Sequence, residues 1–126
     1  MGVLGFGGYF FRSPNPEAAS AWYREHLNVG GGCSGTNEPA SDQWSWMAAG
    51  GAIVFAPFAA DTDYFPANRQ CMLNFRVSRL DELLGKLRAS GIAVETRAEW
   101  DSPATGKFAR IHDLDGNPIE LWQMPG

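Results

Sequence analysis

The sequence repeats one pattern of predicted elements. Phe11-Arg12-Ser13 precedes a stretch with helical spacing that ends near Asn28, and Phe75-Arg76-Val77-Ser78 precedes a second such stretch that ends near Gly91. The two copies are offset by about 64 positions, roughly half of the 126-residue chain. A repeat of this length, with a strand, a helix and further strands in each copy, is too long for a solenoid unit. It predicts an internally duplicated fold with a pseudo-twofold axis and a ligand cleft between the halves.

Length and charge restrict the number of domains and the kinds of partner. A chain of 126 residues buries one core of ordinary size, so we expect both halves to share it in a single domain, 1–126. A net charge of −4 and a pI near 5.0 argue against nucleic acid and membranes as partners, because both reward clustered Lys and Arg. The apolar N-terminus lacks a basic leader and a cleavage site, so we interpret it as a strand. Cys33 and Cys71 are isolated thiols, which favours a reducing, cytoplasmic location.

The first module, 1–58, is expected to hold one helix and several strands. Asn15 suits the N-cap, Pro16 suits the first helical position, and Asn28 tolerates the left-handed conformation that ends a helix. Residues 59–69 have no clear period and are interpreted as the connector to the second module. The strands predicted for this half, from aromatic and β-branched content and glycine boundaries, are 3–12, 42–49 and 52–58.

The second module, 70–126, has clearer signals. Leucines at helical spacing after Leu80 predict a helix, with Ser78 and Asp81 resembling a capping box. A tight turn is predicted at 113–117, where Asp-Gly-Asn supplies a side-chain acceptor and a residue that tolerates positive φ. The predicted strands of this half are 71–77, 92–96, 108–112 and 118–123.

With Trp22-Tyr23-Arg24-Glu25-His26-Leu27 ending the first helix and Asp113-Leu114-Asp115-Gly116-Asn117-Pro118-Ile119-Glu120-Leu121 near the C-terminus, the chain resembles the vicinal oxygen chelate superfamily. This superfamily includes glyoxalase I, bleomycin and fosfomycin resistance proteins and extradiol dioxygenases. The resemblance implies an α+β fold in which two βαβββ modules form a cupped mixed sheet with the helices outside. It also implies a homodimer, in which the modules pair within one chain or are exchanged between two.

The family's metal ligands can be located in this sequence by that resemblance. The two His positions fall on Gly8 and Met72, and the first carboxylate position falls near Phe55; only Glu120 matches. Glycine and thioether do not suit an ion that prefers oxygen and nitrogen ligands. We therefore expect no metal and no cofactor. One alternative remains, in which His112 lies across the terminal hairpin from Glu120 and completes a non-standard site.

Alternation predicts which side chains line the cup. Leu73, Phe75 and Val77 suit the leucine stripe of the helix, which turns the intervening residues toward the concave side. Arg12 and Arg76 would be related by the pseudo-twofold axis and could clasp a carboxylate or phosphate, or could instead neutralise Glu120. Trp44 and Trp46 could line the cup, or could instead pack against a helix or a dimer partner. The expected ligand-binding residues are Phe10, Arg12, Trp44, Trp46, Met72, Asn74, Arg76 and Trp122, together with Glu120.

These observations favour a small-molecule-binding protein without the family's usual metal centre, which sequesters or senses its ligand. The alternative is a divergent lyase, isomerase or dioxygenase in which Glu120 serves as a base or metal ligand. We find no nucleophile elbow, phosphate loop or dinucleotide motif in the chain.

Overall fold

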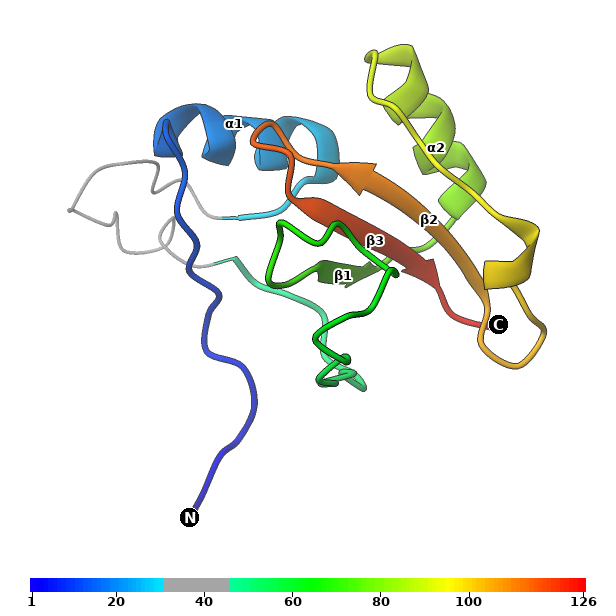
Figure 1. The fold of residues 1–126 in the computed structure, drawn as a ribbon, viewed down its shortest axis with the longest axis horizontal. Helices are drawn as coiled ribbons and strands as arrows, with labels where there is room; N and C mark the ends of the chain where they lie inside the picture. Colours follow the sequence, from blue (N-terminus) through cyan, green and yellow to red (C-terminus); the bar gives the residue numbers. More distant parts are fainter. Residues whose placement is uncertain (31–45) are drawn as a thin grey trace.

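The computed structural model describes residues 1–30 and 46–126, which form an α+β structure with a small mixed sheet (Figure 1). Both helices lie on one side of the sheet, and the N-terminal segment projects away from the body of the molecule. In chain order the elements are α1 (Pro16–Leu27), β1 (Leu73–Arg76), α2 (Leu80–Ala89), the short 3-10 helix η1 (Ala98–Trp100), β2 (Lys107–His112) and β3 (Pro118–Gln123).

The sheet has the order β1-β3-β2, with β1 parallel and β2 antiparallel to the central strand β3. A single antiparallel bridge between Glu95 and Arg110 continues the sheet beyond β2. The predicted strands 108–112 and 118–123 are confirmed, and 71–77 is shortened to β1. The predicted strand 92–96 is reduced to that bridge.

The core lies between the sheet and the two helices, and it separates the two faces of the sheet. Tyr23 from α1 and three leucines from α2 pack against alternate residues of β2 and β3. Leu73 and Phe75 pack against the same cluster, as the alternation predicts. The other face carries the intervening residues and is named here the helix-free face: Asn74, Arg76, Phe108, Arg110, Glu120 and Trp122.

Helix α1 begins and ends as the sequence predicts. The Asn15 side chain accepts a hydrogen bond from the Ala18 N–H at 3.0 Å, and Pro16 occupies the first turn. Asn28 adopts the left-handed conformation at φ 55°, and its N–H bonds the last carbonyls of the helix. A short polar side chain tolerates this conformation better than most residues do.

The predicted turn at 113–117 also fixes α1 to the sheet. Asp113 Oδ1 accepts the N–H groups of Asp115 and Asn117 at 2.9 and 2.8 Å, and Gly116 supplies a φ of +83°. The buried Tyr23 O–H donates to Asp113 Oδ2 at 2.6 Å. One carboxylate therefore closes the β2–β3 turn and holds a helix from the other half of the chain.

Helix α2 is confirmed, but its predicted capping box is wrong. Arg79 occupies the N-cap in the left-handed conformation and makes no side-chain cap. The Leu80 N–H is instead satisfied by Gln123 Oε1 at 2.7 Å. The end of β3 lies next to the start of α2, so a distant amide replaces the local Ser78 hydroxyl.

The strands predicted for the first half are wrong where the structure describes them. Residues 3–12, 46–49 and 52–58 form no ladder, while 42–45 lie outside the described residues. Gly5, inside the first of these segments, has a φ of +154°, which a regular strand of L-residues does not adopt. The duplication into two βαβββ modules is therefore not confirmed. Many apolar side chains of these segments are exposed, including Leu4 and Phe55 at 102% and 85%.

Within the described part of the chain, no helix combines the length and apolar character that crossing a membrane requires.

Candidate functional site

Four polar side chains from four neighbouring segments cross the helix-free face in one line. The register pairs Asn74 with Glu120 and Glu120 with Arg110, and the isolated bridge pairs Arg110 with Glu95. Arg110 exchanges both backbone hydrogen bonds with Glu95, at 2.8 and 2.9 Å. Arg110 and Glu120 must therefore form the closer, non-hydrogen-bonded kind of antiparallel pair, with Cα atoms about 4.5 Å apart. These four residues are named the polar row.

Glu120 is the best-held carboxylate of the row. It is 7% exposed, so its charge needs polar partners. Asn74 Nδ2 donates to Oε1 at 2.8 Å, and the Tyr64 O–H donates to Oε2 in a short hydrogen bond. Both donors are neutral groups. They satisfy the two oxygens without cancelling the charge of Glu120.

Tyr64 keeps its proton at neutral pH. Burial, the hydrogen bond to Glu120 and the negative charge of that carboxylate raise the pKa of Tyr64 to about 12. The nearby Arg110 cation acts in the opposite direction and is the weaker influence. Tyr64 therefore acts as a hydrogen-bond donor toward the row.

The Arg110 guanidinium lies against two aromatic rings. It lies 5.0 Å from the centre of the Tyr64 ring and 5.3 Å from that of Trp100, and these rings meet edge to face at 6.2 Å. A cation over an aromatic face is attracted by the quadrupole of the ring. Both contacts keep the guanidinium on the helix-free face, where Arg110 is 5% exposed.

One edge of this guanidinium has no hydrogen-bond partner among the residues that the structure describes. Nε and Nη2 of Arg110 are buried and bond no group of residues 1–30 or 46–126. Arg97 donates two hydrogen bonds to the Glu95 carboxylate, from Nη2 at 2.7 Å and from Nε at 2.9 Å. The Glu120 carboxylate accepts its hydrogen bonds from the two neutral donors. An unpaired buried donor costs about 1–3 kcal/mol, and a charged one costs more. These two N–H groups are therefore the donors of the polar row that a ligand could bind.

Aromatic side chains gather around Tyr64, beside the Glu120 and Arg110 part of the polar row, while Asn74 and Glu95 at its ends are exposed. The ring of Phe58 lies 5.7 Å from the rings of both Tyr64 and Phe65. Figure 1 shows this part of the chain, in green, passing in front of β1 and β3, which agrees with the bond from Tyr64 to Glu120. The aromatic cover is defined as Phe58, Tyr64, Phe65 and Trp100.

Two further predicted site residues lie on the helix-free face but are already engaged. Arg76 donates to the carbonyls of residues 49 and 50 at 2.9 and 3.3 Å, so it does not pair with a carboxylate among the described residues. Trp122 donates Nε1–H to the Thr105 carbonyl at 2.7 Å and stacks on Phe108 at 5.9 Å. Both side chains flank the polar row, and the hydrogen bonds described for them go to backbone carbonyls.

The remaining predicted site residues are not brought to the row by any described contact. Phe10 is 91% exposed, and Arg12 is exposed and makes no hydrogen bond or ion pair with a described residue. The clasp between Arg12 and Arg76 is therefore not formed. Trp46 meets the ring of Phe75 at 6.2 Å, on the helix-packed side of β1, so it is not a wall of the row. Trp44 lies outside the described residues.

Within residues 1–30 and 46–126, no three His, Cys, Asp or Glu side chains gather in a way that could hold a metal ion. Met72, at the predicted second His position, is half-buried. The register pairs His112 with Pro118 and Arg110 with Glu120, so His112 lies diagonally from Glu120 and not directly across the hairpin from it.

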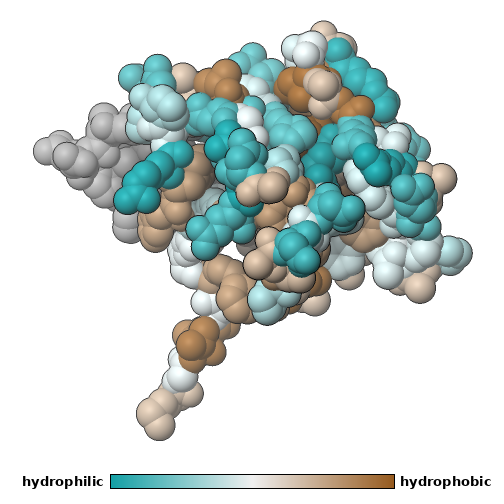
Figure 2. All heavy atoms as spheres, in the orientation of Figure 1, coloured by the Kyte–Doolittle hydropathy of each residue, from teal (hydrophilic) through white to brown (hydrophobic). Residues whose placement is uncertain are grey.

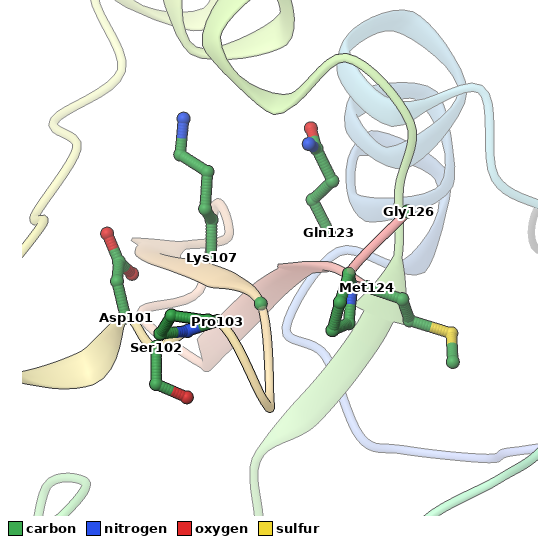
Figure 3. A pocket seen from close by; sticks show the side chains of 9 residues that line it. Asp101, Ser102, Pro103, Lys107, Gln123, Met124 and Gly126 are labelled. Carbon is green, nitrogen blue, oxygen red and sulfur yellow. The ribbon is translucent and has the colours of Figure 1, made fainter.

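A second candidate is the shallow depression in Figure 3, of about 470 Å³, at the end of the β2–β3 hairpin. Its polar groups are already used within the protein. Lys107 binds Asp81 at 2.9 Å, Asp101 accepts the Phe108 N–H at 3.0 Å, and Gln123 caps α2. The polar row is the better site because it retains an unpaired buried cation.

Sequence reasoning found Asn74 and Glu120 but missed Arg110, Tyr64 and Trp100. Arg110 was detectable, because closing the hairpin at 113–117 and alternating outward from the turn sets it opposite Glu120. Tyr64 and Trp100 come from irregular segments, for which no periodic signal exists.

No family model matches this sequence, and no curated protein is significantly similar to it. Among solved structures, the chain is similar to TnmS3, described as an antibiotic binding protein from Streptomyces sp. CB03234. The identity is 25%, 84% of each chain is covered, and the TM-score is 0.45. Because that TM-score is low, we base the functional proposal on the side chains of this chain.

Proposed function

We propose that this chain is a small-molecule-binding protein, related in kind to glyoxalase and bleomycin-resistance proteins, that holds its ligand at the polar row without a resident metal or cofactor. In this role it sequesters or senses the ligand. The observation that carries the proposal is the buried, unpaired edge of Arg110 beside Glu120 under an aromatic cover. Small-molecule sites typically combine aromatic walls with a few polar groups that orient the ligand.

The test is a fragment screen by thermal shift, followed by calorimetric titration of the hits. A ligand that binds only the native state raises Tm by mass action. Glu120→Gln keeps the size of the side chain but removes its charge, so hits should bind it with altered affinity. Glu25→Gln is the matched control, because that carboxylate belongs to α1 and is 76% exposed. Hits unaffected by Glu120→Gln would count against the polar row.

A metal test accompanies the screen. Glu120 alone offers a carboxylate at a position that the family uses for metal, and both its oxygens accept hydrogen bonds. One carboxylate holds a divalent ion weakly. Adding Zn, Ni, Mn or Fe should therefore not raise Tm specifically. A stoichiometric ion retained through purification and lost in Glu120→Gln would overturn the metal-free proposal.

An enzymatic role is the second candidate, as a lyase or isomerase in which Glu120 takes a proton from carbon. The unpaired cation of Arg110 beside this carboxylate favours it, because a fixed positive group stabilises a developing enolate. Incubating screen hits in D2O and following their C–H signals by NMR detects such proton transfer. Exchange that disappears in Glu120→Gln would support an enzyme, and its absence would leave a binding protein.

We also propose that the chain is a cytoplasmic homodimer in which the first-half segments complete the duplicated fold. Figure 2 shows apolar residues on the projecting N-terminal segment. Phe6 and Phe55 are 63% and 85% exposed, and their rings meet at 6.0 Å. Unpaired extended backbone needs partners, which a second copy can supply.

Light scattering at micromolar concentration tests the assembly. Wild type is expected to be a dimer, and Phe6→Asp with Phe55→Asp a monomer. Leu114→Ser is the control, because Leu114 is exposed in the β2–β3 turn. A monomeric wild type would contradict this part of the proposal.

A further inference from the structure

We infer that the ligand carries a singly charged carboxylate, or an equivalent anion with two oxygens side by side, which the Nε/Nη2 edge of Arg110 binds in a bidentate manner. This inference rests on the proposed small-molecule function and names the chemistry of its ligand.

The geometry of the unpaired edge favours this group. Nε and Nη2 are the two nitrogens whose N–H bonds point out of the same side of a guanidinium, and both are unpaired in Arg110. Such a pair of parallel donors matches the spacing of two carboxylate oxygens. A single carbonyl or hydroxyl would satisfy only one of them.

The protein's own carboxylates do not fill this role. Glu95 and Glu120 flank Arg110 in the polar row, but their described hydrogen bonds go to other side chains. They neutralise the cation at a distance and leave its donors free. The hydrogen bonds described for Glu120 come from neutral donors, so its negative charge beside the edge repels a dianion such as a phosphate monoester more strongly than a monoanion.

The surroundings favour a flat, aromatic attachment to the carboxylate. The two unpaired N–H groups lie in the guanidinium plane, and the rings of Tyr64 and Trp100 lie against the same cation, so a carboxylate that accepts both N–H groups lies in that plane close to these rings. A planar ligand can then contact the rings of the aromatic cover, by stacking or edge to face. Because the edge is buried, the segment carrying Tyr64 must shift to admit the ligand. The bound ligand then accepts hydrogen bonds from the two donors that are unpaired in the free protein.

The experiment compares carboxylates with their neutral carboxamides, which have nearly the same shape. The probes are benzoate with benzamide, 2-naphthoate with 2-naphthamide, and 2-naphthyl phosphate as the dianion. Calorimetry gives each Kd, and the Arg110 Nε–Hε NMR signal, assigned by its loss in Arg110→Lys, reports contact at the edge. We expect naphthoate to bind at least about tenfold more tightly than naphthamide and to shift this signal.

Variants separate the effect of the two parallel N–H donors of Arg110 from the effect of its positive charge. Arg110→Lys keeps a cation but loses the parallel donors, so it should lose most of the preference for carboxylate. Arg79→Lys is the matched control, because Arg79 is 80% exposed and pairs with Glu82 at the start of α2, outside the polar row. It should keep the preference. If Arg110→Lys does not fold, the comparison of probes on wild type still decides the matter.

The outcomes are distinguishable. Equal affinity for naphthoate and naphthamide, or tighter binding of the phosphate, would overturn the inferred ligand class and leave the binding function standing. A carboxylate preference kept in Arg110→Lys would also overturn it. Failure of every probe to bind at millimolar concentration would count against the proposed function as well.

Discussion

Replacing Tyr64 by Phe removes one hydroxyl from the polar row and leaves the ring in place. In wild type this hydroxyl donates to Glu120, which is 7% exposed. In Tyr64→Phe the Asn74 amide remains as the described donor to that carboxylate. The ring can still lie over Arg110, since Phe keeps the aromatic face. The variant therefore removes the hydrogen bond to Glu120, together with the weaker polar interaction of the hydroxyl with Arg110.

The expected loss of stability in Tyr64→Phe depends on the strength of this hydrogen bond and on its exposure to solvent. A hydrogen bond to a charged acceptor contributes about 1.5–3 kcal/mol when buried. Tyr64 is partly exposed, so solvent screening reduces this to about 1–2 kcal/mol. For a chain of this length, each 1 kcal/mol corresponds to about 4 °C in Tm. We expect Tyr64→Phe to lower Tm by about 4–8 °C at pH 8.

The effect should depend on pH in a defined direction. The pKa of Tyr64 is raised from 10.0 to about 12 in the folded protein, so folding favours the protonated phenol. This contribution is fully present below pH 10 and is lost as the pH rises from 10 to 12. The difference in stability between wild type and Tyr64→Phe should therefore shrink over that interval.

Urea denaturation of both proteins at several pH values between 8 and about 11.5 measures this difference. Burial and the contact with the Cys71 thiol raise the pKa of Tyr9 to about 12 as well, but Tyr9 titrates in both proteins, so the difference between them reports on Tyr64. A loss below about 0.3 kcal/mol at pH 8, or a loss that does not change with pH, would refute the reasoning.

Three other substitutions test the fold. Tyr23→Phe removes the buried bond to Asp113 and should cost about 1–2 kcal/mol in urea denaturation; no loss would contradict the role of this bond in docking α1. Gly106→Ala would set a Cβ 2.1 Å from the Gln123 carbonyl oxygen at a φ of +105°, so it should cost at least about 2 kcal/mol by thermal unfolding. Gly85→Ala, inside α2 with open space around it, should instead stabilise by about 0.5–1 kcal/mol, and equal effects of the two alanines would refute the geometry.

Much of the second half could be predicted because its signals are local. The leucine stripe locates α2, and the Asp-Gly-Asn turn locates the β2–β3 hairpin. Alternation in β1 also assigns the correct face to Asn74 and to Phe75. The cap of α2 could not be predicted, because its acceptor, Gln123, is distant in sequence.

The strands of the first half could not be judged from composition. Residues 3–12 and 52–58 have the aromatic and β-branched content of strands, but a strand also needs a backbone partner, which local sequence does not specify. Glycines in the first of these segments, Gly5 among them, allow other conformations at little cost.

Some residues of the candidate site could be predicted from local sequence, and others could not. Glu120 and Asn74 follow from alternation within strands, while Arg76, inferred from the repeat, is bound to backbone carbonyls. Arg110 required the register of the hairpin. Tyr64 lies in a connector without a period, so its bond to Glu120 required the structure.

The central claim is that a small molecule binds at the polar row. The most direct measurement is a two-dimensional NMR titration with the naphthoate and naphthamide probes, following side-chain N–H signals at the two candidate places. The account predicts shifts for the Asn74 amide and the Trp100 indole, and none for the Gln123 amide, which marks the depression at the hairpin end. Shifts confined to Gln123 and its neighbours, with Asn74 and Trp100 unchanged, would contradict it.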